Sequence, residues 1–213
     1  MEQAVKTRAV KPFWRGVWVF FLGCLCFIIS QPLTRFPLLG YLQGSVAVTV
    51  FSRTNAFLFA ALVALSAGVF EEGFRFLFKR FLLRPASAPF SQPILFGLGH
   101  GLTEAAIVLI PLILQGYALS GFWIALLERA LSVALHICLT VVVFNGFQTG
   151  RKWLYLIIAV LLHGVVDFVF PTLASLGISV LLVEALYAVF AVPCAVYAAR
   201  SKKYYLSGGT QHV

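Results

Sequence analysis

Six long apolar runs dominate the sequence and restrict the chain to a membrane. Each run has about 18 residues or more, the length that an α-helix needs to cross the hydrocarbon core. The runs are Phe13–Ser30, Asn55–Leu83, Phe90–Leu114, Phe122–Phe147, Trp153–Phe170 and Ile178–Ala199. Backbone polar groups in lipid must be satisfied within the protein, so runs of this length form helices. We predict an all-α membrane protein, a bundle of about six transmembrane helices in which residues 1–213 form a single domain.

The low content of charged residues excludes a soluble fold. Charged residues make up 11% of the chain and hydrophobic residues 61%, whereas soluble domains carry about 25% charged residues. Such a chain cannot cover itself with a surface that water solvates, so the lipid bilayer is its predicted surroundings.

Two segments near the N-terminus need separate interpretation. Basic residues precede the first run, as in a signal peptide, but Gln31–Thr34 lacks a small-x-small cleavage pattern, so we predict a retained membrane helix. The apolar segment near residues 38–52 lies between Pro37 and Arg53 and is too short to span. We predict that it is re-entrant or interfacial.

The basic residues indicate how the chain is oriented. Most of them lie at ends of runs that six alternating spans place on one side of the membrane: Lys6, Arg8, Lys11, Arg15, Lys79, Arg80, Arg84, Arg151, Lys152, Arg200, Lys202 and Lys203. The opposite side has only Arg35 and Arg53. The positive-inside rule therefore predicts that both termini are cytoplasmic. The basic residues that give the chain its net charge of +9 are predicted to contact anionic lipid headgroups, not nucleic acid.

Nearly all acidic residues and histidines lie inside the apolar runs. They are Glu71, Glu72, Glu104, Glu128, Asp167, Glu184, His100, His136 and His163. An ionised residue at the centre of a span costs about 2.5–3.5 kcal/mol, so such residues face the bundle interior, pair with one another or have a function. His212 belongs to the polar tail, where we predict no catalytic role. The structural alternative for a single histidine in a span is a hydrogen bond between helices.

Depth along the helices brings most of these groups into one layer. At about 1.5 Å per residue, Glu71 and Glu72 lie about 12 Å from the cytoplasmic end of their run. By the same rise His100, His136 and His163 lie about 15–16 Å from the cytoplasmic ends of theirs. We therefore predict that these side chains meet around one hydrated pocket, which we expect to open to the cytoplasm.

Helical spacing also pairs several of these groups within their own runs. The pairs are Glu71–Arg75, Glu72–Arg75, His100–Glu104 and His163–Asp167. Residues three or four apart share a helix face, so Arg75 can reach both acids and each carboxylate can fix an imidazole tautomer. We predict that Glu128 packs or supports the site and that Glu184 is structural. Gly97 and Gly101 form a small-xxx-small pair that admits a close neighbour.

Three ordered motifs resemble a known group of membrane enzymes. Glu71-Glu72-Gly73-Phe74-Arg75, Phe96-Gly97-Leu98-Gly99-His100 and His163-Gly164-Val165-Val166-Asp167 resemble the CAAX-protease and bacteriocin-processing superfamily of glutamic intramembrane proteases. More closely, Phe70–Arg75, Gly97–Glu104, Glu128–His136 and Leu162–Asp167 resemble the YhfC-like family of predicted membrane peptidases. The resemblance covers about residues 60–170.

The resemblance implies a site that activates water to hydrolyse peptide bonds of membrane-embedded or membrane-tethered substrates. It makes Glu71 the general base, with Glu72 and Arg75 shaping its charge, and lets His100 position the water. His163 and the residue four later, here Asp167, would bind the oxyanion. Glu104, Glu128 and His136 would then support the site or supply a further donor. The chain departs from the superfamily in having two residues, not three, between Glu72 and Arg75, and Asp in place of Asn at 167.

Other functions use the same residues. A zinc site is possible, with Glu71, His100 and His163 as ligands, although no HExxH motif occurs and the resemblance requires no cofactor. A proton-coupled carrier would use buried acids and histidines as a relay, and a non-catalytic scaffold would use them for packing. Hydrolysis is the predicted activity, and the sequence leaves the substrate and the oligomeric state open.

Overall fold

A computed structural model of the chain describes residues 12–83, 88–116 and 119–205. The predicted basic positions Lys6, Arg8, Lys11 and Arg84 lie outside these residues, as does His212. The described part consists of helices joined by short turns, without a strand, and six of its helices are long and apolar enough to cross a membrane. The predicted fold class is therefore confirmed.

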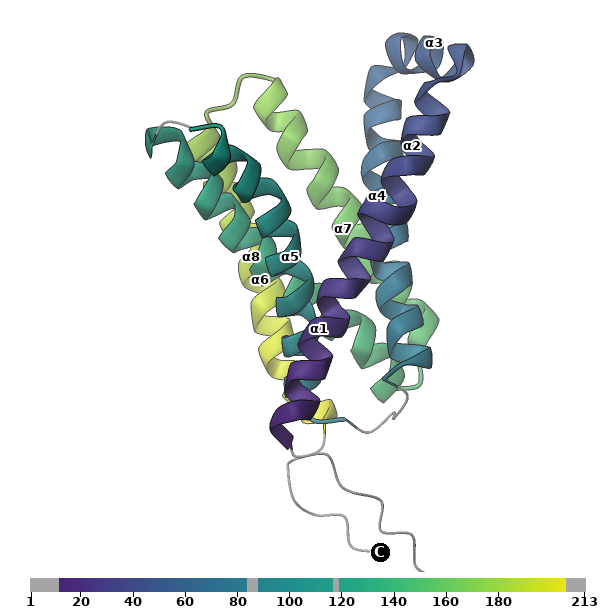
Figure 1. Ribbon diagram of the computed structural model, residues 1–213, viewed down its shortest axis with the longest axis vertical. Coiled ribbons are helices and arrows are strands. Elements are labelled where there is room, and N and C mark those ends of the chain that lie inside the picture. The colour runs from purple at the N-terminus through teal and green to yellow at the C-terminus, as the bar shows by residue number, and fades with distance from the viewer. Residues whose placement is uncertain (1–11, 84–87, 117–118, 206–213) are drawn as a thin grey trace, which may run out of the picture.

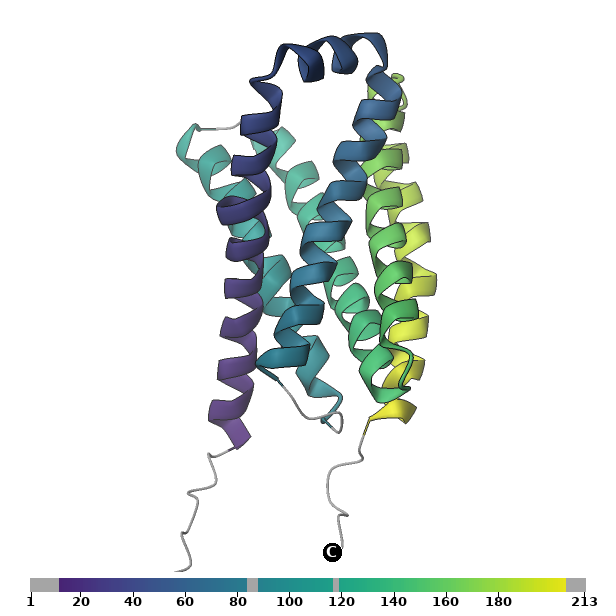
Figure 2. The same ribbon diagram turned by 90° about the vertical axis from the view of Figure 1, so that its right-hand side faces the viewer.

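The first membrane helix is longer than the sequence indicated. It runs as α1 (Pro12–Ser30), a π-helical turn η1 (Gln31–Arg35) and α2 (Phe36–Gln43), and its membrane-length part extends from Phe13 to Gln43. The prediction that the first span ends at Ser30 is wrong, because Pro32 lies within a π-helical turn here and does not end the helix. The short α3 (Val46–Thr54) then lies across the end of the bundle (Figure 2), as an interfacial segment would, but residues 38–43 of the predicted 38–52 segment belong to α2 and to the first span.

The other five membrane helices follow the predicted runs closely. They are α4 (Ala56–Phe81), α5 (Ser91–Leu114), α6 (Leu119–Gln148), α7 (Lys152–Ser175) and α8 (Val180–Arg200), which ends in the 3-10 turn η2 (Ser201–Tyr204). Gly116, Gly150 and Gly177 follow the ends of α5, α6 and α7 with φ of 69°, 74° and 84°. Glycine is favoured there because only it adopts this left-handed conformation without steric cost.

The helices form two arms that diverge toward α3 (Figure 1). In this view α2 and α4 lie on one side and α5, α6 and α8 on the other, and α7 packs on α4 and crosses between them toward α8. At the other end of the bundle α1 packs on α5, and α6 packs on α7. The described ends of α1 and α8 lie at this closed end, which we call the terminal end of the bundle.

Glycines let the helix backbones approach closely at three interfaces. A Cβ atom on Gly99 of α5 would lie 2.1 Å from the Phe20 carbonyl oxygen of α1. One on Gly97 would lie 2.6 Å from the Ile137 Cα of α6, and one on Gly68 of α4 would lie 2.5 Å from a carbonyl of α7. The predicted close packing at Gly97 is confirmed. These contacts fix α5 against α1 and α6, and α4 against α7.

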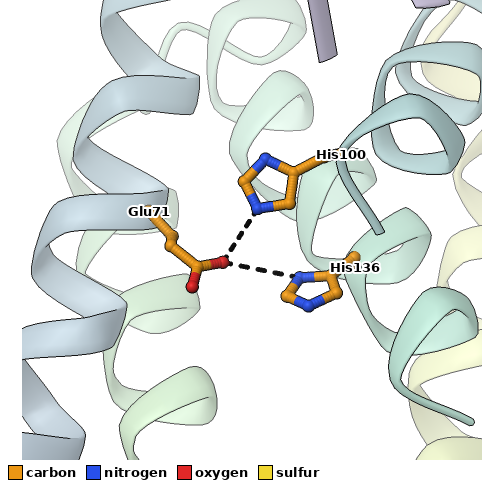
Figure 3. Close-up of side chains that lie close together, drawn as sticks. All are labelled: Glu71, His100 and His136. Atoms are coloured by element: carbon orange, nitrogen blue, oxygen red, sulfur yellow. Dashed lines mark hydrogen bonds and ion pairs between the residues drawn. The ribbon is translucent and has the colours of Figure 1, made fainter. Parts of the chain in front are cut away.

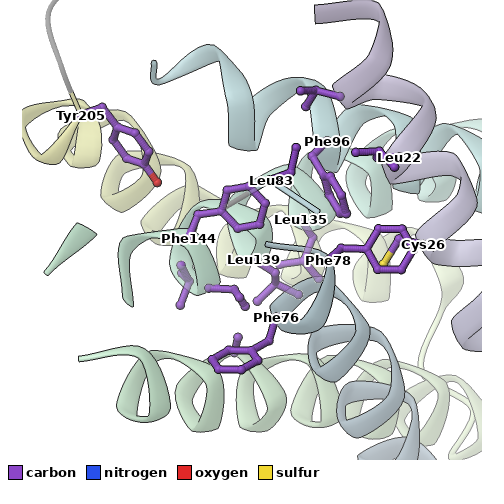
Figure 4. Close-up of a cluster of buried hydrophobic side chains, with 14 of the residues drawn as sticks. Leu22, Cys26, Phe76, Phe78, Leu83, Phe96, Leu135, Leu139, Phe144 and Tyr205 are labelled. Carbon is purple, nitrogen blue, oxygen red and sulfur yellow. The ribbon is translucent and has the colours of Figure 1, made fainter. Parts of the chain in front are cut away.

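The apolar core fills the terminal half of the bundle. Leu22, Phe76, Phe78, Phe96 and Phe144 form its centre (Figure 4). Phe76 and Phe78 follow Glu71 and Glu72 on α4 toward the terminal end. The buried acids and histidines therefore lie on the α3 side of this core, where the two arms begin to separate.

Candidate metal centre

Glu71 of α4 lies at the centre of the buried polar cluster. Its Oε2 atom is 2.8 Å from His100 Nε2 and 3.7 Å from His136 Nδ1 (Figure 3). The same oxygen lies 3.9 Å from His163 Nε2 and 3.5 Å from Arg75 Nη2. The sequence prediction that these groups share one layer is confirmed, because four helices bring them around a single oxygen atom.

Gln31 of η1 is a hydrogen-bond partner of Glu71 that sequence reasoning missed. Its Nε2 donates to Glu71 Oε1 over 2.6 Å, and Arg35 Nη1 donates to Gln31 Oε1 over 3.0 Å. The π-helical turn places both residues against α4, and Arg35 also donates to Ser66 Oγ over 2.9 Å. The available signal was the polar pair at i and i+4 between two apolar segments, a spacing that puts both residues on one helix face.

Glu72 binds two other members of the cluster, Arg75 and His163. Its Oε1 accepts hydrogen bonds from Arg75 Nη1 and, over 2.8 Å, from His163 Nδ1. Glu72 and Arg75 are fully buried, and His163 nearly so. Arg75 thus reaches both glutamates, as the i,i+3 and i,i+4 spacing predicts.

The hydrogen bonds of His136 fix its tautomer. A guanidinium only donates, so the 2.8 Å contact from Arg75 Nη2 makes His136 Nδ1 the acceptor. The proton therefore sits on Nε2, which contacts Glu104 Oε2. Glu104 Oε1 in turn accepts from Arg129 Nη1 over 2.6 Å. The carboxylate that the sequence pairs with His100 binds His136 instead.

Three further acids lie at the edge of the cluster. Asp167 Oδ2 is 3.6 Å from His163 Nε2, as the i,i+4 spacing predicts, and 38% of its side chain is exposed. Glu128 accepts from its neighbour Arg129 over 2.6 Å, and Glu184 of α8 is buried. All three line the cavity described next.

A cavity of about 650 Å³ extends from the cluster between the two arms. Its lining on α4 runs from Ala60 to Glu71, and on α8 from Val180 to Tyr187. These stretches lie toward the α3 end of both helices (Figure 1). The expected pocket exists, but it leads away from the terminal end. The expectation that it opens on the side of the termini is wrong, because aromatic core residues fill that half.

The cluster offers ligand atoms that suit a divalent metal. One atom each from Glu71, His100 and His136 lies within 4.8 Å of the other two, and all three residues are buried. Two imidazoles and one carboxylate form a common zinc ligand set that leaves a coordination position for water or substrate. The Nε2-bound proton of His136 leaves Nδ1 as its ligand atom, and Glu104 orients the ring, as carboxylates behind metal-bound histidines do. The donor set therefore fits zinc.

Comparisons with known proteins agree with this chemistry. The family model described as YhfC intramembrane metalloprotease matches residues 4–121 and 109–191, which together include most of the chain. No curated protein matches the sequence. The spans, the buried Glu–His cluster and this match lead to one conclusion: the chain belongs to the YhfC family of intramembrane metalloproteases.

Proposed function

We propose that this integral membrane protease is a zinc-dependent endopeptidase whose metal is held by Glu71, His100 and His136. The observation that carries the proposal is the group of three buried ligand atoms within 4.8 Å of one another, at the inner end of a large cavity. A zinc ion held there supplies Lewis-acid polarisation of the scissile carbonyl and makes water a stronger acid.

The residues around these ligands have distinct proposed roles. Glu104 holds the His136 ring through Nε2, and Gln31 holds Glu71 through Oε1, so both ligands are oriented before substrate arrives. The Nδ1–H of His163 donates to Glu72, which turns Nε2 toward Glu71 and Asp167. His163 is thereby placed to take a proton from water in the cavity and to return it to the leaving amine.

The cavity indicates which substrates reach the site. It lies between membrane-spanning arms and ends on polar groups at mid-bundle. A peptide bond of a membrane-embedded or membrane-tethered protein can enter it from the α3 end. With both termini in the cytoplasm, as the basic residues predict, this route begins on the extracytoplasmic side.

A metal-free glutamic mechanism is the second candidate. The contact between Arg75 and His136 favours it, because the His136 lone pair is then occupied and Glu71 already has a cation beside it. In that mechanism Glu71 is the general base and Glu72 with Arg75 adjusts its charge. His100 positions the water, and His163 with Asp167 stabilises the oxyanion.

Cleavage of a fluorogenic membrane-derived peptide by the purified chain in detergent separates these mechanisms. The zinc mechanism predicts that a chelator abolishes cleavage, that added zinc restores it, and that Glu71→Gln is inactive while the control His212→Ala is not. Cleavage that survives chelation but not Glu71→Gln supports the glutamic mechanism. Full cleavage by a folded Glu71→Gln variant contradicts both.

A further inference from the structure

Arg75 occupies the acceptors that a metal ion would use. Its Nη2 donates to His136 Nδ1 over 2.8 Å and lies 3.5 Å from Glu71 Oε2. These residues provide two of the three ligands in the candidate metal centre. The guanidinium is fully buried, so it is the cation that these groups share in the structure described here.

The hydrogen bond from Arg75 to His136 Nδ1 and a metal ion on the same nitrogen exclude each other. A neutral imidazole has one nitrogen with a lone pair, which lies in the ring plane and accepts one partner. Glu104 holds the proton of His136 on Nε2, so Nδ1 is the only nitrogen available to a metal. A metal therefore binds His136 only after the Arg75 Nη2 hydrogen bond has broken.

Glu72 provides a place for the released guanidinium. Arg75 Nη1 already donates to Glu72 Oε1. Among the described residues, two buried atoms of this pair have no hydrogen-bond partner, Arg75 Nε and Glu72 Oε2. Once Nη2 leaves His136, a rotation of the guanidinium can bring it to Oε2 while Nη1 stays on Oε1, which makes the pair bidentate, the strongest arrangement for Arg and carboxylate. The unpaired Oε2 acceptor of Glu72 is thus matched to the Nη2 donor that a displaced Arg75 has free.

We propose that Arg75 is the resident cation of the metal-free centre, and that zinc displaces it from His136 onto Glu72. This inference rests on the metal centre of the proposed function. Without metal, Arg75 neutralises Glu71 and Glu72 and keeps the ligands in place. It also competes with every arriving cation, so only a metal that binds imidazole strongly displaces it, which favours zinc over magnesium.

Zinc affinity measured by competition with a chromophoric chelator tests the inference on the purified full chain. Removing a competitor strengthens binding, whereas removing a supporting residue weakens it. Arg75→Gln is expected to bind zinc at least about tenfold more tightly, the equivalent of one charge-assisted hydrogen bond. The zinc-free variant should unfold at a lower temperature than wild type, and zinc should raise its Tm by more. Arg80→Gln, which removes an exposed charge from the same helix, should match wild type.

Arg75→Lys keeps the experiment informative if the glutamine variant does not fold. The lysine retains a charge for Glu72 but lacks the fork that spans to His136, so it too should bind zinc more tightly than wild type. Equal or weaker zinc binding by the folded Arg75 variants overturns the inference and leaves the metal centre intact. Wild-type protein that binds no zinc overturns both the inference and the zinc mechanism.

Discussion

Glu104 shows how much of the proposed metal centre depends on residues behind the proposed ligands. It contacts His136 Nε2 on one side and is held by Arg129 on the other. Without it, the His136 proton can move to Nδ1 and block the ligand atom. Carboxylates in this position typically contribute about 10–100-fold to metal affinity or activity.

We predict that Glu104→Ala lowers kcat/KM for peptide cleavage and zinc affinity, each by about 10–100-fold. The two losses should run in parallel, because both arise from the His136 ring. Cleavage assays and chelator competition on the same preparation check this. Unchanged zinc affinity in a folded Glu104→Ala protein would separate Glu104 from the metal centre.

Gln31 gives a second test at the residue scale. Its amide is a neutral donor to Glu71 Oε1 and an acceptor for Arg35. We predict that Gln31→Leu, which leaves two buried polar groups unpaired, lowers the free energy of unfolding by about 1–3 kcal/mol and reduces kcat more than it changes KM. Steady-state kinetics with thermal unfolding checks this, and unaltered kcat would show that Glu71 needs no such support.

The sequence predicted that Glu71 and the three histidines cluster, but it did not predict all of their hydrogen-bond partners. Depth along each helix depends only on residue number, so the shared layer of Glu71, His100, His136 and His163 could be predicted. Which carboxylate faces which imidazole depends on helix rotation and crossing angle. For that reason Glu104 was assigned to His100, although it contacts His136 in the structure.

At the scale of elements, the interface between α1 and α5 controls where His100 lies. Gly99 precedes His100 directly, and a Cβ atom there would meet the α1 backbone at 2.1 Å. Because backbone atoms cannot move aside as a flexible side chain does, a methyl group at this position must push the two helices apart. The displacement would carry His100 away from Glu71.

We predict that Gly99→Ala destabilises the protein by at least about 1–3 kcal/mol and lowers its zinc affinity. Gly73→Ala is the matched control, since a Cβ atom there meets nothing within 4 Å and alanine favours the helix by up to about 1 kcal/mol. Thermal unfolding in one detergent compares the two. A Gly99→Ala protein as stable as Gly73→Ala would contradict the close packing of α1 and α5.

The π-helical turn η1 is the element that sequence patterns could not reveal. Pro32 usually marks a helix end because it lacks an N–H and clashes with the preceding turn. Here the wider π-helical turn accommodates it, and the helix continues to Gln43. Such turns occur often at functional sites, and this one brings Gln31 onto Glu71 and Arg35 onto Gln31.

At the scale of the whole molecule, the diverging arms place the cavity on the side opposite the terminal end. Six spans return the chain to the side on which it starts, and the basic residues predict that this side is cytoplasmic. Together these features predict that a substrate would enter from the extracytoplasmic half of the bilayer. The sequence could not predict this direction, because hydropathy does not tell a filled half of a bundle from an open one.

Cysteine accessibility tests the direction of the cavity. In a variant whose four cysteines are replaced, we predict that Val180→Cys at the cavity is labelled by a membrane-impermeant maleimide in intact cells. Arg151→Cys, between α6 and α7 at the terminal end, should be labelled only after permeabilisation. The reverse pattern would place the cavity on the cytoplasmic side.

The zinc X-ray absorption spectrum of the purified chain tests the central claim most directly. The Glu71–His100–His136 centre predicts a first shell of nitrogen and oxygen at about 2.0–2.1 Å, with imidazole scattering and no sulfur. Both the bound zinc and this shell should be lost in Glu71→Gln. A sulfur shell near about 2.3 Å, which would assign the metal to cysteines, or an unchanged spectrum in Glu71→Gln would contradict the account.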